Sequence, residues 1–299
     1  MTIVNGNPVC CAPTGDRCGE GILWHPGEAA IYWTDINRFL IHRFDPETQA
    51  VKSWFFEEPV TAVLLTTRDN VLAVCLGSGV ILWQPRTDVR ENYRFKLPGW
   101  PRVRLNDAGV DPRGSLWAGS MRNNVNSDGS EGEAGGSDGV LYRIDPDGTI
   151  TEAETQLGIS NTLVWSPDQK TFYFGDTLVN KIWAYEYERT TGAIRKSRDY
   201  LANFSRGLPD GSTIDAQGFV WNCRWNGSCI VRVARDGAID FILEMPTRNI
   251  TNCTFGGQNL DVLYITTAGN PDDKGDRFAG GLFAVKTQTH GLPENRFLV

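Results

Sequence analysis

The sequence predicts an all-β protein, a six-bladed β-propeller, from two observations. A pattern of two short apolar strands joined by a tight turn recurs six times along the 299 residues. Successive copies start 41 to 55 residues apart, and most of them continue into a third and a fourth strand-like run. Four short strands in each repeat of roughly 40–50 residues are typical of propeller blades. We therefore expect a single propeller domain spanning residues 1–299.

The clearest copy of this hairpin lies in the third repeat. Residues 107–110 and 115–118 are expected to be strands, with a turn at 111–114 between them. The turn has Pro at its second position and Gly at its fourth, where a type I turn prefers them. Arg104 and Asn106 stand just before the first strand. Side chains that hydrogen-bond this strongly are unexpected at the start of a small, apolar strand, unless they cap the turn or form a site.

The six expected blades follow one another along the chain. We place them at residues 20–56, 60–97, 106–154, 161–200, 210–245 and 251–285. A strand around residues 9–11 should close the ring, and residues 296–299 could share that task. The third blade contains a polar, glycine-rich insert at 122–138. Because it cannot bury a core of its own, we expect a mobile or lid-like loop that lacks apolar anchors.

Aligned on their turns, the six hairpins begin with polar residues, namely Glu20, Thr61, Asn106, Asn161, Asp210 and Thr251. The first strand of each blade lines the central channel of a propeller, so these side chains should converge near one mouth of the channel. The loop after each second strand opens at the same mouth. It should be rimmed by Asp35, the insert, Asp176, residues 225–226 and residues 269–272. Binding residues are commonly found in such loops.

Four of the converging residues offer oxygen ligands, namely Glu20, Asn106, Asn161 and Asp210. Ca²⁺ and Mg²⁺ prefer cages made only of oxygen, and Mn²⁺ also accepts them. Two carboxylates that face each other in a channel repel unless a cation lies between them. We therefore expect one divalent cation in the central channel. The alternative is a polar channel filled with water.

Composition excludes several other classes of protein. A net charge of −7 without a basic cluster argues against a nucleic-acid partner. No apolar run approaches the ~18 residues of a membrane helix, and the N-terminus has no secretory signal pattern. The seven cysteines contain no Cys-x-x-Cys pair, which argues against a zinc site of that kind. We expect a cytoplasmic protein without a membrane partner.

Four segments resemble the gluconolactonase/regucalcin (senescence marker protein) family over nearly the whole chain. They are Gly19-Glu-Gly-Ile-Leu-Trp24, Arg104-Leu-Asn-Asp107, Ser160-Asn-Thr-Leu-Val-Trp-Ser-Pro-Asp168 and Leu208-Pro-Asp-Gly-Ser-Thr-Ile-Asp215. The resemblance implies a six-bladed propeller with one divalent metal ion (Ca²⁺, Mg²⁺, Mn²⁺, Zn²⁺ or Fe²⁺) in the channel. It places the metal ligands on Glu20, Asn161 and Asp210, and substrate-binding positions on Arg104 and Asn106.

Two positions depart from the pattern of this family. Ile22 stands where many members carry Pro, which is a detail of the strand start. Asn124 falls near the place where regucalcin-like members have a substrate-binding Glu. Asn124 therefore joins the expected substrate-binding residues, and it bears on which sugar is preferred.

The expected activity is metal-dependent hydrolysis of a sugar lactone, an aldonolactone such as gluconolactone, to the sugar acid. Asp210 is the candidate ligand that also accepts the proton of the attacking water, with Asp107 behind it. Asn106 should orient the ring oxygen of the lactone. Arg104 should bond its hydroxyl or carbonyl groups, unless it forms a salt bridge to Asp107 instead. Asp176, at the mouth, favours a hydroxylated substrate.

Two other functions remain open from the sequence. The metal-dependent phosphotriesterases of squid type use a similar Glu/Asn/Asn/Asp quartet, so the substrate could be an aryl ester or a phosphotriester. A propeller that binds calcium without catalysis is the third reading. No Gly-x-Ser-x-Gly motif is present, and the three histidines lie outside the expected mouth. Any chemistry should therefore come from the metal and from carboxylates.

Overall fold

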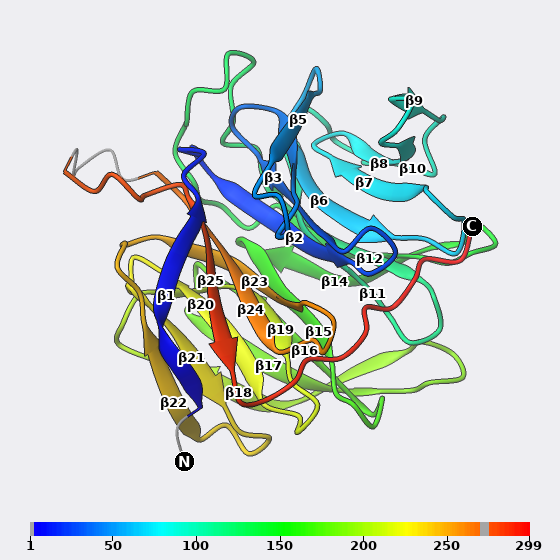
Figure 1. The fold of residues 1–299 in the computed structure, drawn as a ribbon. Coiled ribbons are helices and arrows are strands. Elements are labelled where there is room, and N and C mark those ends of the chain that lie inside the picture. The colour runs from blue at the N-terminus through cyan, green and yellow to red at the C-terminus, as the bar shows by residue number, and fades with distance from the viewer. Residues whose placement is uncertain (1–2, 270–274) are drawn as a thin grey trace.

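In a computed structural model that describes residues 3–269 and 275–299, the chain forms six antiparallel sheets arranged around a central channel (Figure 1). The inner strands β2, β6, β11, β15, β19 and β23 contact one another in a closed ring. The expected six-bladed propeller is therefore confirmed. No helix among the described residues is long and apolar enough to span a membrane.

The first strand of each blade lies at the channel and the next strands follow outward, except that β9 and β10 of blade two both pair with β8. Blade one consists of β2 (Gly19–His25), β3 (Ala30–Asp35), β4 (Leu40–Phe44) and β5 (Val51–Phe55). Blade two consists of β6 (Val60–Leu65), β7 (Leu72–Leu76), β8 (Gly79–Gln84), β9 (Val89–Arg90) and β10 (Phe95–Lys96). Blade three consists of β11 (Val103–Val110), β12 (Leu116–Arg122), β13 (Gly139–Ile144) and β14 (Ile150–Leu157).

The second half of the chain repeats this plan. Blade four consists of β15 (Ser160–Trp165), β16 (Thr171–Asp176), β17 (Lys181–Tyr187) and β18 (Ile194–Ala202). Blade five consists of β19 (Leu208–Ile214), β20 (Val220–Trp225), β21 (Cys229–Val233) and β22 (Ile239–Glu244). Blade six consists of β23 (Ile250–Gly256), β24 (Val262–Thr267) and β25 (Leu282–Thr287), with β1 (Val4–Ala12) as its outer strand.

The two ends of the chain behave differently. The strand β1 pairs antiparallel with β25, which lies beside it in Figure 1, so the N-terminal segment closes the ring as expected. The C-terminal segment does not share this task. Phe297 forms a parallel bridge with Thr66 in blade two, and Gly291 bridges Asp215 in blade five. Residues 288–299 therefore cross the far end of the channel as a strap, because their hydrogen-bond partners lie in several blades.

A repeated turn motif explains how two of the hairpins are held. In Asp111-Pro-Arg-Gly-Ser-Leu-Trp117, Asp111 Oδ1 accepts the backbone N–H groups of Arg113 and Ser115. Its Oδ2 accepts the indole N–H of Trp117 at 3.0 Å. Asp215 makes the same three bonds in blade five, ending on Trp221 at 3.0 Å. A buried carboxylate thus satisfies its own turn and an indole that would otherwise lie unpaired in the core.

Candidate functional site

Every inner strand carries a β-bulge at the same level of the channel. The register of each inner strand against its neighbour shifts after Glu20, Val60, Leu105, Asn161, Pro209 and Ile250. A bulge places extra residues opposite a single partner, which bends the strand and turns a side chain in a new direction. The aligned polar residues therefore lie at a common irregularity within the strands, and not before them.

Glu20 and Asp210 meet at the centre of this level. The two side chains share a hydrogen bond, and they are 8 % and 6 % exposed. Glu20 Oε2 also accepts the Asn252 amide and the Gly21 backbone N–H, each at 3.0 Å. Burial raises the pKa of Glu20. Burial, together with repulsion from Glu20 and Asp107, raises the pKa of Asp210 well above its usual value.

A third carboxyl group, Asp107, lies near this pair. Burial first, and then the charge of Glu20, raises the pKa of Asp107 to about 8. One of its oxygens accepts the backbone N–H of Ala108 at 2.8 Å. The cluster therefore combines three buried carboxyl groups that are hard to ionise together without a positive charge among them. This is the electrostatic condition that favours a bound cation.

Asn161 is oriented by its own blade. Its amide nitrogen donates to Thr177 Oγ1 at 2.8 Å, which leaves its Oδ1 directed to Asn106, whose Nδ2 lies 3.4 Å away. The next residue, Thr162, has a φ of 58°, which is unusual for a β-branched residue. Its hydroxyl donates to the Asp210 carbonyl at 2.7 Å. The backbone is therefore strained at Thr162, within the bulge that follows Asn161.

Arg104 lies beside the cluster and is only 5 % exposed. Its Nη1 donates to Asn106 Oδ1 at 2.7 Å, and its Nε and Nη2 donate to Asn124 Oδ1 at 3.2 and 2.9 Å. The expected alternative, a salt bridge to Asp107, is not among the ion pairs of the described residues. Burial lowers the pKa of Arg104 to about 10, so it stays charged at neutral pH.

The donor set fits a hard divalent cation. Glu20 and Asp210 supply carboxylate oxygens and Asn161 supplies an amide oxygen, from three different blades. The set combines two carboxylates with one amide. The described residues contain no group of three or more His, Cys, Asp and Glu side chains placed to hold a metal. All-oxygen ligands with excess negative charge are nevertheless what Ca²⁺ and Mg²⁺ prefer.

Asp176 takes a different role from the one expected at the mouth. Its oxygens accept the backbone N–H groups of Gly158, Ile159 and Leu178 at 2.7 to 3.1 Å. Asp35 bonds its own loop in the same way in blade one. Both residues cap the loops that lead into the inner strands. The structure thus brings Arg104, Asn106 and Asn124 together. The Asp176 carboxylate instead accepts hydrogen bonds from backbone N–H groups.

Two residues of the site region are absent from the sequence prediction. Asn252 bonds Glu20, whereas alignment of the turns selects its neighbour Thr251, because the extra residue of a bulge cannot be counted from the sequence. Val125 in the insert is 6 % exposed and packs in a cluster with Ile36 and Phe39 of blade one. The expectation that the insert lacks an apolar anchor is therefore wrong.

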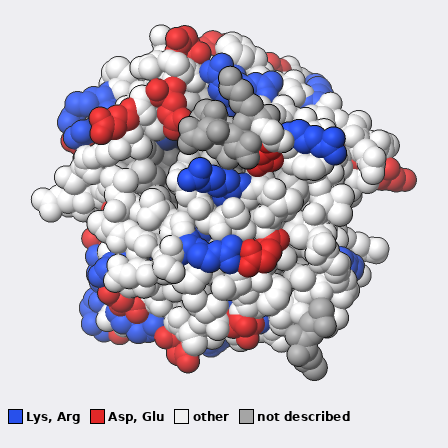
Figure 2. Space-filling view, turned by 90° about the vertical axis from the view of Figure 1, so that its left-hand side faces the viewer, with Lys and Arg blue, Asp and Glu red and all other residues white. Residues whose placement is uncertain are grey.

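The remaining rim residues extend around the same mouth. Arg122 belongs to the end of β12, so the insert proper starts one residue later than expected. Gly269 accepts the Asn249 side-chain amide at 3.0 Å, whereas residues 270–272 lie outside the described part of the chain. On the face drawn in Figure 2, basic and acidic side chains are interspersed without a broad patch of one sign.

The channel continues behind the cluster as a cavity of about 370 Å³. It is lined by the later residues of the inner strands, such as Leu163 and Ile214, and by the strap residues 292–295. Asp107 and Asn252 line it at the level of the site. The carboxylate cluster therefore divides the channel into a front half, at the mouth with the insert, and a rear half behind it.

Comparison with known proteins gives a consistent result. The family described as "SMP-30/Gluconolactonase/LRE-like region" matches residues 18–269. "Pentonolactonase XacC" of Haloferax volcanii is 36 % identical over 292 residues, covering 95 % of each chain. "Putative sugar lactone lactonase YvrE" of Bacillus subtilis is 33 % identical over 287 residues, covering 94 % of each chain. The crystal structure of a calcium-binding protein, regucalcin, from Agrobacterium tumefaciens has a TM-score of 0.91 at 24 % identity, covering 100 % of each chain.

Proposed function

We propose that this chain, which belongs to the SMP-30/gluconolactonase/LRE-like family, hydrolyses a sugar lactone to the sugar acid at the front of its channel. The observation that carries the proposal is the meeting of Glu20, Asn161 and Asp210 with Arg104 and Asn106 in one buried group. Relatives named as lactonases, 36 % and 33 % identical over almost the whole chain, support the same activity.

Glu20, Asn161 and Asp210 are the residues that would hold the divalent cation. When bound there, the cation supplies Lewis-acid polarisation of the lactone carbonyl and stabilises the charge that develops on its oxygen. The excess of buried carboxylate at this place supports a cation as the missing positive charge. The calcium-binding regucalcin with the same fold leaves Ca²⁺ as one candidate among the divalent ions.

The chain's own residues perform the remaining steps. Water adds to the carbonyl carbon, and Asp210 accepts its proton, with Asp107 behind it. The ring C–O bond then breaks, and the proton passes to the ring oxygen, which becomes the new hydroxyl group. Asn106 orients the ring oxygen, and the Arg104 guanidinium directs its fork at the hydroxyl or carbonyl groups of the lactone.

The test is an assay of metal-stripped protein against a panel of substrates, with Ca²⁺, Mg²⁺, Mn²⁺, Zn²⁺ and Fe²⁺ added back singly. The panel contains five- and six-carbon aldonolactones, an aryl acetate and a phosphotriester. We expect turnover of an aldonolactone that depends on added metal and exceeds turnover of the other two classes. Faster hydrolysis of the aryl ester or phosphotriester would replace the proposed substrate class. Tight metal binding without any turnover would identify a non-enzymatic calcium-binding propeller.

A further inference from the structure

We propose that the insert 122–138 docks into a preformed socket on blade one, and that this docking sets the position of Arg104 through Asn124. The socket consists of residues 14–18 and 35–39. The proposal rests on the function proposed above, because Arg104 is taken to bind the lactone. It assigns the docking residues of the insert, Val125 and Gly129, as positioning residues for that substrate.

The insert has one apolar anchor. Val125 is the only large apolar side chain among residues 122–138, which are otherwise polar or small. It is 6 % exposed, and it packs with Ile36 and Phe39 of the socket and with half-buried Cys18. The segment that follows, residues 126–128, is exposed. A single buried valine in an exposed, glycine-rich loop marks the place where the loop is held.

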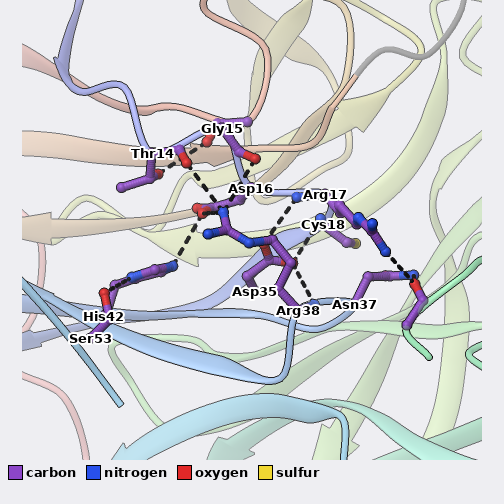
Figure 3. A network of polar contacts seen from close by, with 12 residues as sticks. Thr14, Gly15, Asp16, Arg17, Cys18, Asp35, Asn37, Arg38, His42 and Ser53 are labelled. Atoms are coloured by element: carbon purple, nitrogen blue, oxygen red, sulfur yellow. Dashed lines mark hydrogen bonds and ion pairs between the residues drawn. The ribbon is translucent and has the colours of Figure 1, made fainter. Parts of the chain in front are cut away.

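Gly129 provides the second point of docking. Its carbonyl accepts the Arg17 guanidinium and the Asn37 amide, each at 3.1 Å. Figure 3 shows the side chains of Arg17 and Asn37, one from each half of the socket, directed to the same side. The φ of Gly129 is 76°, and a Cβ atom there would lie 2.0 Å from the Asn37 carbonyl oxygen. The insert can approach the socket this closely only because residue 129 has no side chain.

The socket is held by blade one, independently of the insert. Asp35 accepts the backbone N–H groups of Arg17, Cys18 and Arg38 at 3.0 to 3.2 Å. Behind it, Asp16 accepts the Trp33 indole at 2.7 Å and lies 3.1 Å from His42 Nε2. The other ring nitrogen of His42 contacts Ser53 on the outer strand (Figure 3). Two buried carboxylates thus tie segments 14–18 and 35–39 to the blade.

The docked insert reaches Arg104 through the residue before its anchor. Asn124 Oδ1 accepts two of the guanidinium N–H groups of Arg104, and its backbone carbonyl accepts the Gly132 N–H at 2.7 Å. Arg104 in turn donates to Asn106, whose amide donates to the Ser160 carbonyl at 2.9 Å. A continuous chain of contacts therefore runs from the socket on blade one to the cluster. Undocking would remove one of the two side-chain acceptors of Arg104.

The first experiment compares Gly129→Ala with Gly135→Ala in the same insert. A Cβ atom at Gly135 would meet nothing within 4 Å, which makes it a matched control. We expect Gly129→Ala to raise KM for the lactone about tenfold with a smaller change in kcat, because ground-state positioning is lost. Gly135→Ala should stay within about twofold of the wild type. Equal KM values for the two variants would overturn the proposal.

A double-mutant cycle tests whether the anchor acts through Asn124. Val125→Ala and Asn124→Ala are each expected to raise KM, and the double variant should be no worse than Asn124→Ala alone. Residues that act through one another show such coupling, whereas independent residues show additive effects. Additive effects would mean that Val125 supports the insert without positioning Arg104, and would overturn the proposed route.

Hydrogen exchange separates failure of this inference from failure of the proposed function. The N–H groups of Gly129 and Gly132 bond within the insert, to the carbonyls of Asn126 and Asn124. Gly129→Ala should speed their exchange at least ~10-fold, while Gly135→Ala should not. A wild type that turns over no lactone refutes the proposed function, yet exchange still tests docking. If the wild type turns over lactone, two results for Gly129→Ala overturn the present inference. One is unchanged exchange of the N–H groups at 129 and 132, and the other is faster exchange with an unchanged KM.

Discussion

The front and rear halves of the channel are lined by the same six strands, yet they present different sets of side chains. The front carries Glu20, Asn106, Asn161 and Asp210, and the insert covers it from blade three. The rear is a cavity whose wall includes apolar stretches such as 62–65, and the strap closes it. The boundary between the halves coincides with the bulges.

This difference shows that the position along the strand, more than the identity of the blade, determines what a side chain can do here. At the bulge level, a side chain leaves the regular alternation and points to its counterparts in other blades. Behind it the strands pair regularly, and side chains such as Leu23, Val63 and Leu65 pack in the core of blades one and two. The predictions below test whether catalysis and stability divide at this boundary.

Replacement of Asp210 should have the largest effect. Asp210→Asn keeps the size and one oxygen of the side chain but removes a charge and a proton acceptor. If Asp210 is both ligand and base, lactone hydrolysis should fall at least ~10²-fold, and excess metal should not restore it. Glu20→Gln removes a charge without removing a base, so added metal should recover much of its loss. The measurement is lactone turnover of both variants across a metal titration.

Near- and far-ultraviolet circular dichroism should show the same fold for both variants, because unpaired buried carboxylates do not stabilise the metal-free protein. Full recovery of Asp210→Asn by metal, to the same extent as Glu20→Gln, would show that Asp210 is a ligand only. The base would then have to be another group, and Asp107 is the carboxyl group of the cluster that is not an expected metal ligand.

Replacement of Arg104 by Lys should reduce kcat/KM about tenfold. A lysine keeps the charge, but it cannot donate to Asn106 Oδ1 and Asn124 Oδ1 in the fixed geometry of the guanidinium fork. Steady-state kinetics on the best lactone measures the change. A kcat/KM equal to that of the wild type would show that only the charge of Arg104 matters at the front.

Removal of the Asp107 charge should stabilise the metal-free protein at high pH. Its pKa is raised to about 8, so the folded state holds a proton that the unfolded chain releases near pH 4. Stability is therefore lost as pH rises from about 4 towards 8. Asp107→Asn should melt at the same temperature as the wild type at pH 4, and several degrees higher at pH 8, both in chelator.

The matched control for this prediction is Glu133→Gln, which removes a charge from an exposed residue of the insert. It should leave the melting temperature unchanged at both values of pH. If Asp107→Asn melts below the wild type at pH 8, the hydrogen bonds of the Asp107 carboxylate stabilise the protein by more than its burial destabilises it.

The rear wall should give the smallest effects, and on stability alone. Trp165 lines the rear cavity, and its indole nitrogen has no hydrogen-bond partner among the described residues. Trp165→Phe should therefore change the free energy of unfolding by less than Trp117→Phe, whose ring lies beside it in β12. The latter loses the bond to buried Asp111 and should cost about 1–3 kcal/mol. Denaturant titration measures both, and a change of KM in either variant would contradict the division of the channel.

The blades and the group of site residues could be predicted because hairpin turns are local signals. The Pro and Gly of residues 111–114 mark a turn whatever the rest of the chain does, and aligning such turns brings Asn106 level with Glu20 and Asp210. The bulges could not be predicted, since register depends on pairing between strands. This is why Asn252 was missed in favour of its neighbour Thr251.

Two further residues show where local reasoning ends. Val125 is a single valine in a polar stretch, and one apolar residue has no periodicity from which burial could be inferred. Asp176 stands at the end of a second strand, where an exposed ligand and a loop cap look the same in sequence. Only the three backbone N–H groups around it distinguish the two roles.

The pairing of β1 with β25 also has a consequence for the order in which the protein can be made. About 270 residues separate the two strands, and ribosomes add roughly 5–20 residues per second. The first strand synthesised must therefore wait on the order of 15–60 s for its partner. Its composition suits this delay, because Val4–Ala12 is mostly exposed or half-buried even in the finished ring and contains both Gly6 and Pro8. A strand of this kind resists pairing with other chains while it waits.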